Sequence, residues 1–185
     1  MTEQAHHLSP EQAAQFFKDM EAEGEPEVEF NPGIASRIAS KTVAAGVLIH
    51  DSNGRILFVT PVYKPYPEIP GGIVDANESP YLALQREIRE ELGIALNVGN
   101  LLVVDWTPMH GVWRDSLQFI FDGGTLSSRS IEQIELPRDE LKTFEFRALD
   151  EVKSLLKPSF HRRLHEANIA KADGRTRYLD FGRPV

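Results

Sequence analysis

The apolar and polar positions of this chain follow strand-like periods in some segments and a helical period in others. Residues 42–49 and 55–62 are β-branched and apolar on either side of Asp51-Ser52-Asn53-Gly54, which predicts a β-hairpin. Residues 79–92 are predicted to form a helix, preceded by a proline-rich loop at 63–70. Elsewhere we expect strands at 101–106, 116–121 and 143–149, a turn at 122–124, a polar loop at 127–138, and helices at 150–156 and 159–171. Strands around one central helix, followed by late helices, indicate a mixed α/β sandwich.

The N-terminal residues have a pattern of their own. Ser9 is a suitable N-cap and Pro10 fits the first helical position, while Gly24-Glu25-Pro26 would end the helix. Its apolar face would consist of Phe16, Phe17 and Met20. We expect an accessory helix that docks on the main body or on a second subunit, and we predict a homodimer.

Composition narrows the class of protein. The 185 residues include no cysteine, which excludes a disulfide framework, thiolate metal sites and a cysteine nucleophile. Of 28 acids and 20 bases, eight acids and one base lie in residues 1–30, so residues 31–185 hold 20 acids and 19 bases. A nearly neutral body argues against a nucleic-acid-binding surface. No apolar run approaches the roughly 20 residues that cross a bilayer, so we expect a cytoplasmic protein without membrane contacts.

The helix predicted at 79–92 has two distinct faces. Ser79 suits the N-cap, Gly93 suits a left-handed ending, and an apolar stripe of Tyr81, Leu84, Ile88 and Leu92 would face the core. Glu87, Glu90 and Glu91 share the adjoining face. Three like charges at this spacing repel one another, so a cation there would be stabilising.

Oxygen-only ligands on a helix favour a hard cation such as Mg²⁺, with Mn²⁺ as a substitute. The residues therefore indicate a metal-dependent site that acts on a phosphate or diphosphate. The alternative is a solvated acidic face paired with Arg86 and Arg89.

Residues 72–94 resemble the Nudix box, G-x5-E-x7-R-E-U-x-E-E-x-G-U, where U is aliphatic. Every fixed position matches, at Gly72, Glu78, Arg86, Glu87, Ile88, Glu90, Glu91, Gly93 and Ile94. The resemblance implies a Nudix-type α/β/α sandwich with a mixed β-sheet at 41–156. Residues 1–40 would then be an N-terminal extension with a short helix, and residues 157–185 a C-terminal helix and tail.

The resemblance also implies hydrolysis of a nucleoside diphosphate linked to another moiety. Glu87, Glu90 and Glu91 would be the metal ligands, with Glu90 and Glu91 also catalytic, and a carbonyl of Gly71 or Gly72 would join them. Arg86 would orient the glutamates and contact substrate, with Glu78 as its partner and Gly93 in a structural role. Members of the family often use a further acid outside the box. Our first choice for it is Glu140, which precedes the strand at 143–149, with Glu132 and Glu135 as runners-up.

Several aromatic residues are candidates for contact with the nucleoside. Tyr63, Tyr66 and Trp113 lie in loop-like sequence, where they could stack on a base or simply be exposed. Trp106 ends a strand and could equally belong to the core. The cluster of His161, Arg162 and Arg163 fits a solvated helix face.

Residues outside the box that distinguish Nudix subfamilies do not identify the substrate of this chain. Pro108 lies close to the proline of ADP-ribose hydrolases but is offset from it, and Trp113 stands where dinucleoside polyphosphate hydrolases have a tyrosine. The candidates are nucleotide sugars, including ADP-ribose, and nucleoside triphosphates. The alternative function is a non-catalytic nucleotide-sensing module of the same fold. Isopentenyl diphosphate isomerases share the fold but rely on a cysteine, which this chain lacks.

Overall fold

The computed structural model describes residues 9–23 and 32–185 and divides the chain into two compact units, Met1–Ser40 and Lys41–Val185. The first unit contains α1 (Pro10–Ala22) and the short α2 (Ile34–Arg37). Helix α1 begins as predicted, because the Ser9 side chain accepts from the Gln12 amide and the Gln12 side chain accepts from the Ser9 amide. The predicted stop at Gly24-Glu25-Pro26 lies outside the described residues.

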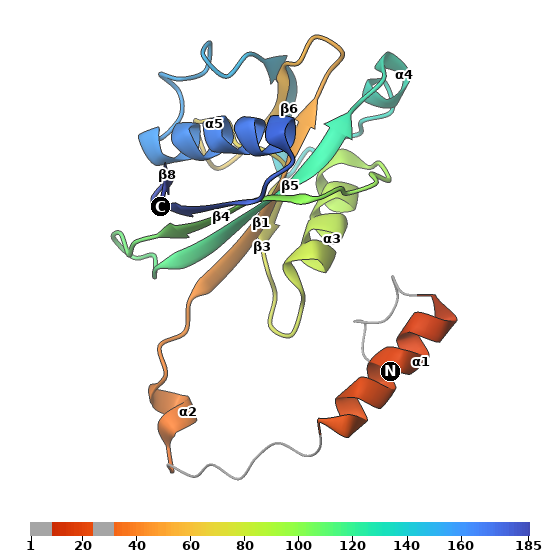
Figure 1. Ribbon diagram of the computed structural model, residues 1–185. Coiled ribbons are helices and arrows are strands. Elements are labelled where there is room, and N and C mark those ends of the chain that lie inside the picture. Colours follow the sequence, from red (N-terminus) through yellow and green to blue (C-terminus); the bar gives the residue numbers. More distant parts are fainter. Residues whose placement is uncertain (1–8, 24–31) are drawn as a thin grey trace. The chain divides into compact units, whose positions relative to one another are not determined.

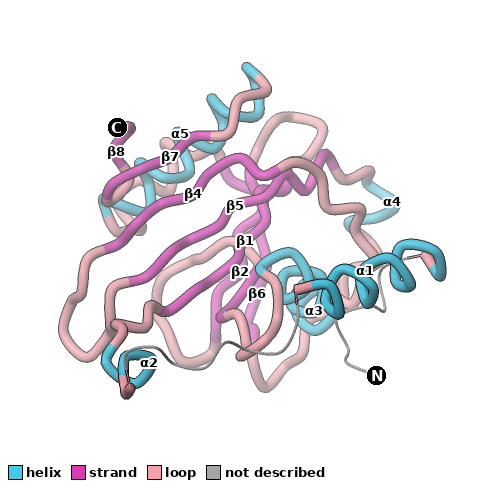
Figure 2. Tube along the Cα trace, turned by 60° about the horizontal axis from the view of Figure 1, so that its bottom comes forward, coloured by secondary structure: helices cyan, strands magenta, loops and turns pink. Residues whose placement is uncertain are grey.

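The second unit is built on one mixed sheet (Figure 2). The strands run in the order β6-β2-β1-β5-β4-β7-β8, with β3 also beside β1. The β1–β5 and β4–β7 pairs are parallel and the other pairs are antiparallel. The strands are β1 (Thr42–His50), β2 (Ile56–Pro61), β3 (Gly71–Ile73), β4 (Leu101–Thr107), β5 (Ser116–Thr125), β6 (Leu141–Arg147), β7 (Arg177–Asp180) and β8 (Arg183–Pro184), and the helices are α3 (Pro80–Leu92), α4 (Ser128–Ile131) and α5 (Pro158–Asp173).

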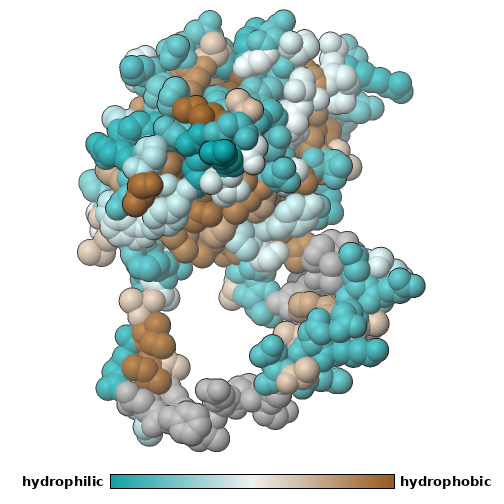
Figure 3. Space-filling view, in the orientation of Figure 1, coloured by the Kyte–Doolittle hydropathy of each residue, from teal (hydrophilic) through white to brown (hydrophobic). Residues whose placement is uncertain are grey.

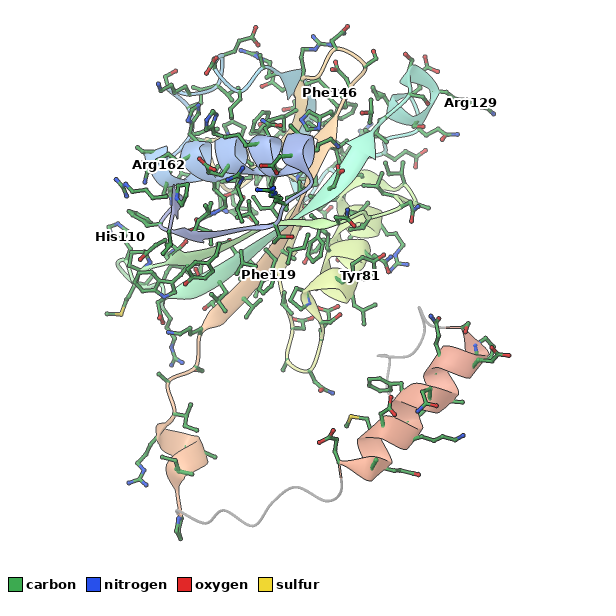
Figure 4. All side chains as sticks on the ribbon, in the orientation of Figure 1. Tyr81, His110, Phe119, Arg129, Phe146 and Arg162 are labelled. Atoms are coloured by element: carbon green, nitrogen blue, oxygen red, sulfur yellow. The ribbon has the colours of Figure 1, made fainter. Side chains whose placement is uncertain are left out.

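Helices α3 and α5 cover opposite faces of this sheet (Figure 1). Successive side chains of β1 point to opposite faces of the sheet. Val47 and Ile49 therefore belong to the core under α3, and Leu48 belongs to the core under α5. Phe119 and Tyr81 pack on the α3 side (Figure 4). The outward face of α5 is mostly hydrophilic (Figure 3), as expected for a helix that buries its other side. The predicted α/β/α sandwich with a mixed sheet is confirmed.

The predicted turn at 122–124 is wrong, because Asp122-Gly123-Gly124 continues β5 to Thr125. A Cβ on Gly123 would lie 2.5 Å from the Ile49 side chain, so this glycine permits close packing against β1. The register between β1 and β5 shifts beside it, between Leu48 and His50, and Gly124 has a φ of 70° there. The glycines thus mark an irregularity within a strand.

The C-terminal third differs from prediction in two further ways. Residues 150–156 form turns rather than a helix, since Pro158 holds Lys157 extended and prevents a continuous helix into α5. Strands β7 and β8 are not predicted from the sequence, although they extend the sheet beyond β4. No helix among the described residues is long and apolar enough to cross a membrane.

Candidate active site

Helix α3 is fixed in rotation by its apolar stripe and in length by its two caps. Leu84, Ile88 and Leu92 are at most 1% exposed. Ser79 accepts from the Leu82 amide at the first turn, and Gly93 ends the helix in the left-handed conformation. The glutamate face therefore has one orientation, toward β3.

Two glycines bring the backbone of β3 against that face. The Gly71 amide donates to Glu91 Oε2 at 2.8 Å. Gly71 has a φ of 137°, and a Cβ there would lie 2.2 Å from the Ala45 carbonyl oxygen. A Cβ on Gly72 would lie 2.3 Å from Glu87 Oε1. A larger residue at position 71 would therefore force β3 away from β1, and one at position 72 would displace the Glu87 carboxylate.

Arg86 connects the carboxylates of the box. Its Nε and Nη2 donate to the two oxygens of Glu78 at 3.2 and 3.0 Å, which is a bidentate pair. Its Nη1 donates to Glu87 Oε1 at 2.8 Å and to Glu90 Oε2 at 3.2 Å. The Arg86 hydrogen bonds hold the pKa of Glu78 below its usual range. A single guanidinium thus orients three glutamates.

Burial makes two of the glutamates poor anions in the absence of a cation. Desolvation raises the pKa of Glu91 to about 8, against the Gly71 hydrogen bond that lowers it. Desolvation also raises the pKa of Glu87, although Arg86 opposes the shift. Negative charge on Glu140 adds to both increases, and Glu68 adds to that of Glu91. Four carboxylates therefore share one region, with their mutual repulsion incompletely offset.

A cleft of about 880 Å³ opens beside this group. Its lining includes Glu87, Glu91, Arg86, Gly71 and Gly72. Glu90 does not line the cleft; its side chain is 55% exposed.

Of the three acids predicted outside the box, Glu140 lines this cleft. It follows the turn that leads into β6, where its carbonyl accepts from the Val62 amide. Glu132 and Glu135 do not line the cleft, and the Glu135 amide instead bonds to the Leu92 carbonyl at the end of α3. The geometry favours Glu140 over the two runners-up.

The predicted aromatic residues Tyr63, Tyr66 and Trp113 all line the cleft while remaining exposed. Lysine ammonium groups lie over two of the rings, Lys64 at 5.2 Å from the Tyr63 centroid and Lys157 at 5.9 Å from the Tyr66 centroid. These two lysine–tyrosine pairs place positive charge beside aromatic rings in the lining of the cleft.

Other aromatic and histidine side chains point elsewhere. Trp106 donates from Nε1 to Asp115 at 3.2 Å and does not line the cleft. His110 lies at the tip of the β4–β5 hairpin (Figure 4), where it is exposed.

The prediction of a solvated face at 161–163 is wrong for Arg163, which is 7% exposed and lines the cleft. Its Nε donates to Asp105 Oδ2 at 2.6 Å and its Nη2 donates to Thr107 Oγ1 at 2.9 Å. Asp105 is fully buried and also accepts from the Gly182 amide. The helical pattern of α5 does not reveal this pair, because Asp105 lies 58 positions away in the sequence.

Sequence reasoning also missed four cleft residues that are recognisable from the structure, namely Lys64, Glu68, Gln118 and Lys157. Lys64 Nζ bonds to both oxygens of Glu68 at 2.8 Å. The i,i+4 spacing of a lysine and a glutamate is a weak signal for this pair. Nothing local in the sequence marks Gln118 or Lys157.

The carboxylate oxygens of Glu87 and Glu91 are suitable ligands for a divalent cation. Among the described residues, no three acid or histidine side chains already converge in a metal-binding arrangement. The Glu87 and Glu90 carboxylates are bonded to Arg86. To coordinate an ion, these side chains would have to turn from Arg86 toward it. The desolvated carboxylates of Glu87 and Glu91, with the β3 backbone against them, are hard oxygen donors whose repulsion a cation would relieve.

Two sequence comparisons relate this chain to known proteins. A family profile for the NUDIX domain matches residues 40–167. An RNA pyrophosphohydrolase from Halorhodospira halophila (strain DSM 244 / SL1) is 39% identical over 49 residues, which are 26% of this chain and 27% of that protein. The match therefore spans about a quarter of that relative's length.

Solved structures share the fold. The MutT protein from Methanosarcina mazei Go1 is 18% identical, with a TM-score of 0.59 over 75% of this chain and 100% of that chain. A MutT NUDIX hydrolase from Burkholderia pseudomallei is 28% identical, with a TM-score of 0.52 over 60% of this chain and 86% of that chain. Since the profile covers more than half of the chain and includes the complete box, the protein belongs to the NUDIX domain family of Nudix hydrolases.

Proposed function

We propose that this protein hydrolyses the diphosphate bond of a nucleoside diphosphate linked to another moiety, with Mg²⁺ as its cation and Mn²⁺ as a substitute. The observation that carries the proposal is the group formed by Glu87, Glu91 and Glu140 beside a cleft of about 880 Å³. A volume of this size accommodates a small organic ligand. Carboxylates with little solvation and much mutual repulsion are suited to a cationic cofactor.

The residues of the box bind and orient the cation in this proposal. Glu87, Glu90 and Glu91 hold the cation together with a carbonyl of Gly71 or Gly72. A divalent cation so bound supplies charge neutralisation for the diphosphate and acidifies a water molecule. Arg86 keeps the glutamates oriented through the bonds described above.

The remaining steps fall to groups that line the cleft. Glu140 accepts the proton of the attacking water as the water oxygen bonds to phosphorus, and the bond from that phosphorus to the bridging oxygen breaks, so that the other phosphate leaves with the bridging oxygen. Lys157 provides positive charge for the substrate phosphates. Tyr63, Tyr66 and Trp113 contact the nucleoside by stacking.

The direct test is a panel of nucleotide sugars, dinucleoside polyphosphates, triphosphates and 5′-triphosphorylated RNA, incubated with Mg²⁺ or Mn²⁺ and read out by products. We expect release of a nucleoside monophosphate or a diphosphate from at least one class. Tight nucleotide binding without any product would instead support the sensing module, and it would overturn the proposed hydrolysis.

We expect hydrolysis to stop when divalent cations are removed, and Mg²⁺ to raise the melting temperature of the protein. Binding to the native state adds RT ln(1+[L]/Kd), about 2.7 kcal/mol when the ion is at 100 times its Kd. The measurements are activity after exhaustive chelation and thermal melts with millimolar Mg²⁺, using Ca²⁺ and ionic strength as controls. Activity that survives chelation contradicts the proposal, and an unchanged melting temperature counts against a preformed site.

We propose further that α1 mediates a homodimer. Its side chains Phe17 and Met20 are 38% and 56% exposed, and an apolar helix face of this kind is stabilised by burial against a second copy. Full-length protein at micromolar concentration should have a dimeric mass by light scattering, and deletion of residues 1–40 should lower it to that of a monomer. A monomeric full-length protein would refute the dimer.

A further inference from the structure

The cleft continues beyond the glutamates to a second polar group on the α5 side of the sheet. Thr107 at the end of β4, Gln118 on β5 and Arg163 on α5 line this part. The register of the strands brings these elements together, since Asp105 pairs with Gln118 and Thr107 pairs with Ser116.

Sheet geometry gives the separation between the two ends. Gly71, which bonds to Glu91, pairs with Gly46 on β1, and Ala44 on β1 pairs with Gln118 on β5. Gln118 is thus two strands across and two residues along from Gly71, which corresponds to about 12 Å. Ala44 is the β1 residue between them on this face and carries a single methyl group, so no large side chain on β1 blocks the path.

The distal group carries no uncompensated charge. Arg163 is neutralised by the buried carboxylate of Asp105, and its second bond goes to Thr107. A further phosphate would gain little there, because the guanidinium is already paired. Lys157, six residues before Arg163 at the N-cap of α5, has its ammonium over the Tyr66 ring. A neutral polar ligand group is therefore favoured at this end.

Gln118 has the chemistry to recognise such a group. Its Nε2 donates to Ser116 Oγ at 2.9 Å, and Ser116 is 7% exposed. Among the hydrogen bonds of the described residues, its Oε1 and its second amide hydrogen have no partner. A carboxamide then presents one acceptor beside one donor, which is the pairing that a nucleobase edge offers. Trp113, five residues before it, lines the same cleft and offers a ring face.

We infer that Gln118, held in place by Ser116, recognises the hydrogen-bonding edge of the nucleobase and sets base preference in this protein. The inference rests on the proposed function for the identity of the ligand, but its test requires no turnover. Trp113 supplies stacking that every base shares, and Gln118 supplies discrimination among bases. Matched hydrogen bonds of this kind discriminate by about 5- to 150-fold.

The test measures binding of AMP, GMP, CMP, UMP and ribose 5-phosphate to the full-length protein by calorimetry without metal. Wild-type protein should prefer at least one base by fivefold or more. The substitution Gln118→Leu should erase that ratio and leave ribose 5-phosphate affinity unchanged. Gln118→Glu should shift preference toward guanine, whose N1–H and N2 amino group both donate to a carboxylate, and Ser116→Ala should reduce the ratio in part. The control Gln133→Leu, on an exposed glutamine away from the cleft, should behave as wild type.

The outcomes separate this inference from the proposed hydrolysis. No base preference in the wild-type protein, or an unchanged ratio in a folded Gln118→Leu or Gln118→Glu variant, overturns the role of Gln118. Equal loss of affinity for every base and for ribose 5-phosphate also overturns it. Selective binding that depends on Gln118 but brings no hydrolysis under any metal upholds the base site and rejects the hydrolase.

Discussion

Replacing Glu91 with glutamine is expected to lower kcat by about 10²–10³-fold and to raise the thermal stability of the metal-free protein. The loss follows from removing one charge from the proposed cation site, where charge stabilisation is strongest. The gain follows from burial, because Glu91 is 7% exposed and must lose its charge or remain poorly solvated in the folded state. Glutamine keeps the shape and can still accept from the Gly71 amide.

The stability difference should depend on pH with a defined sign. Burial raises the pKa of Glu91 in the folded state to about 8 from its ordinary value of 4.5, so the folded protein holds this proton more tightly than the unfolded chain. The Glu91 contribution to the free energy of unfolding therefore falls as pH rises from about 4.5 to 8 and is constant above that. We expect Glu91→Gln to lack this decrease in the free energy of unfolding. The variant should therefore become increasingly more stable than the wild-type protein between pH 5 and 8. Each kcal/mol corresponds to about 2–4 °C in a chain of this size.

Thermal melts of both proteins in chelator across this pH range measure the effect. Glu132→Gln, at an exposed position outside the cleft, is the matched control and should show neither the kinetic nor the thermal change. A Glu91→Gln enzyme with wild-type kcat at saturating Mg²⁺ would remove Glu91 from the cation site.

Helix α3 is specified by residues within its own segment. The stripe that orients α3 and the caps that bound it are all within 15 residues, so the helix could be predicted from its own segment. Helical spacing placed Glu87, Glu90 and Glu91 on one face, but it could not tell the buried Glu91 from the exposed Glu90. That difference comes from β3, whose backbone covers Glu91 and not Glu90.

Non-local packing explains the errors as well. Asp122-Gly123-Gly124 has the composition of a turn, yet Val47 and Ile49 of the parallel neighbour occupy the space that a larger residue than Gly123 would need. Arg163 fits an exposed position by local pattern, but its partner Asp105 comes from a distant strand. Contacts between segments far apart in the sequence decide both cases, one between neighbouring strands and one between α5 and β4.

The identity of the acid outside the box is also a non-local question, and Glu140→Gln answers it most directly. If Glu140 accepts the proton of the attacking water, kcat should fall by about 10²–10⁴-fold while Mg²⁺ affinity is largely retained. The fold should be unaffected, because Glu140 is exposed and its hydrogen bonds to Val62 and Pro137 use backbone atoms.

Glu132→Gln is the matched control, since Glu132 is exposed and lies outside the cleft. The measurements are kcat and its Mg²⁺ dependence for both variants, with melting temperatures to verify folding. A change within about twofold for Glu140→Gln would make it an ordinary surface carboxylate, because loss of a general base costs at least about 100-fold. A large loss in Glu132→Gln would move the role to the loop after α4. A fall in Mg²⁺ affinity with kcat restored at saturating Mg²⁺ would instead make Glu140 a ligand, which its electrostatic coupling to Glu87 and Glu91 also allows.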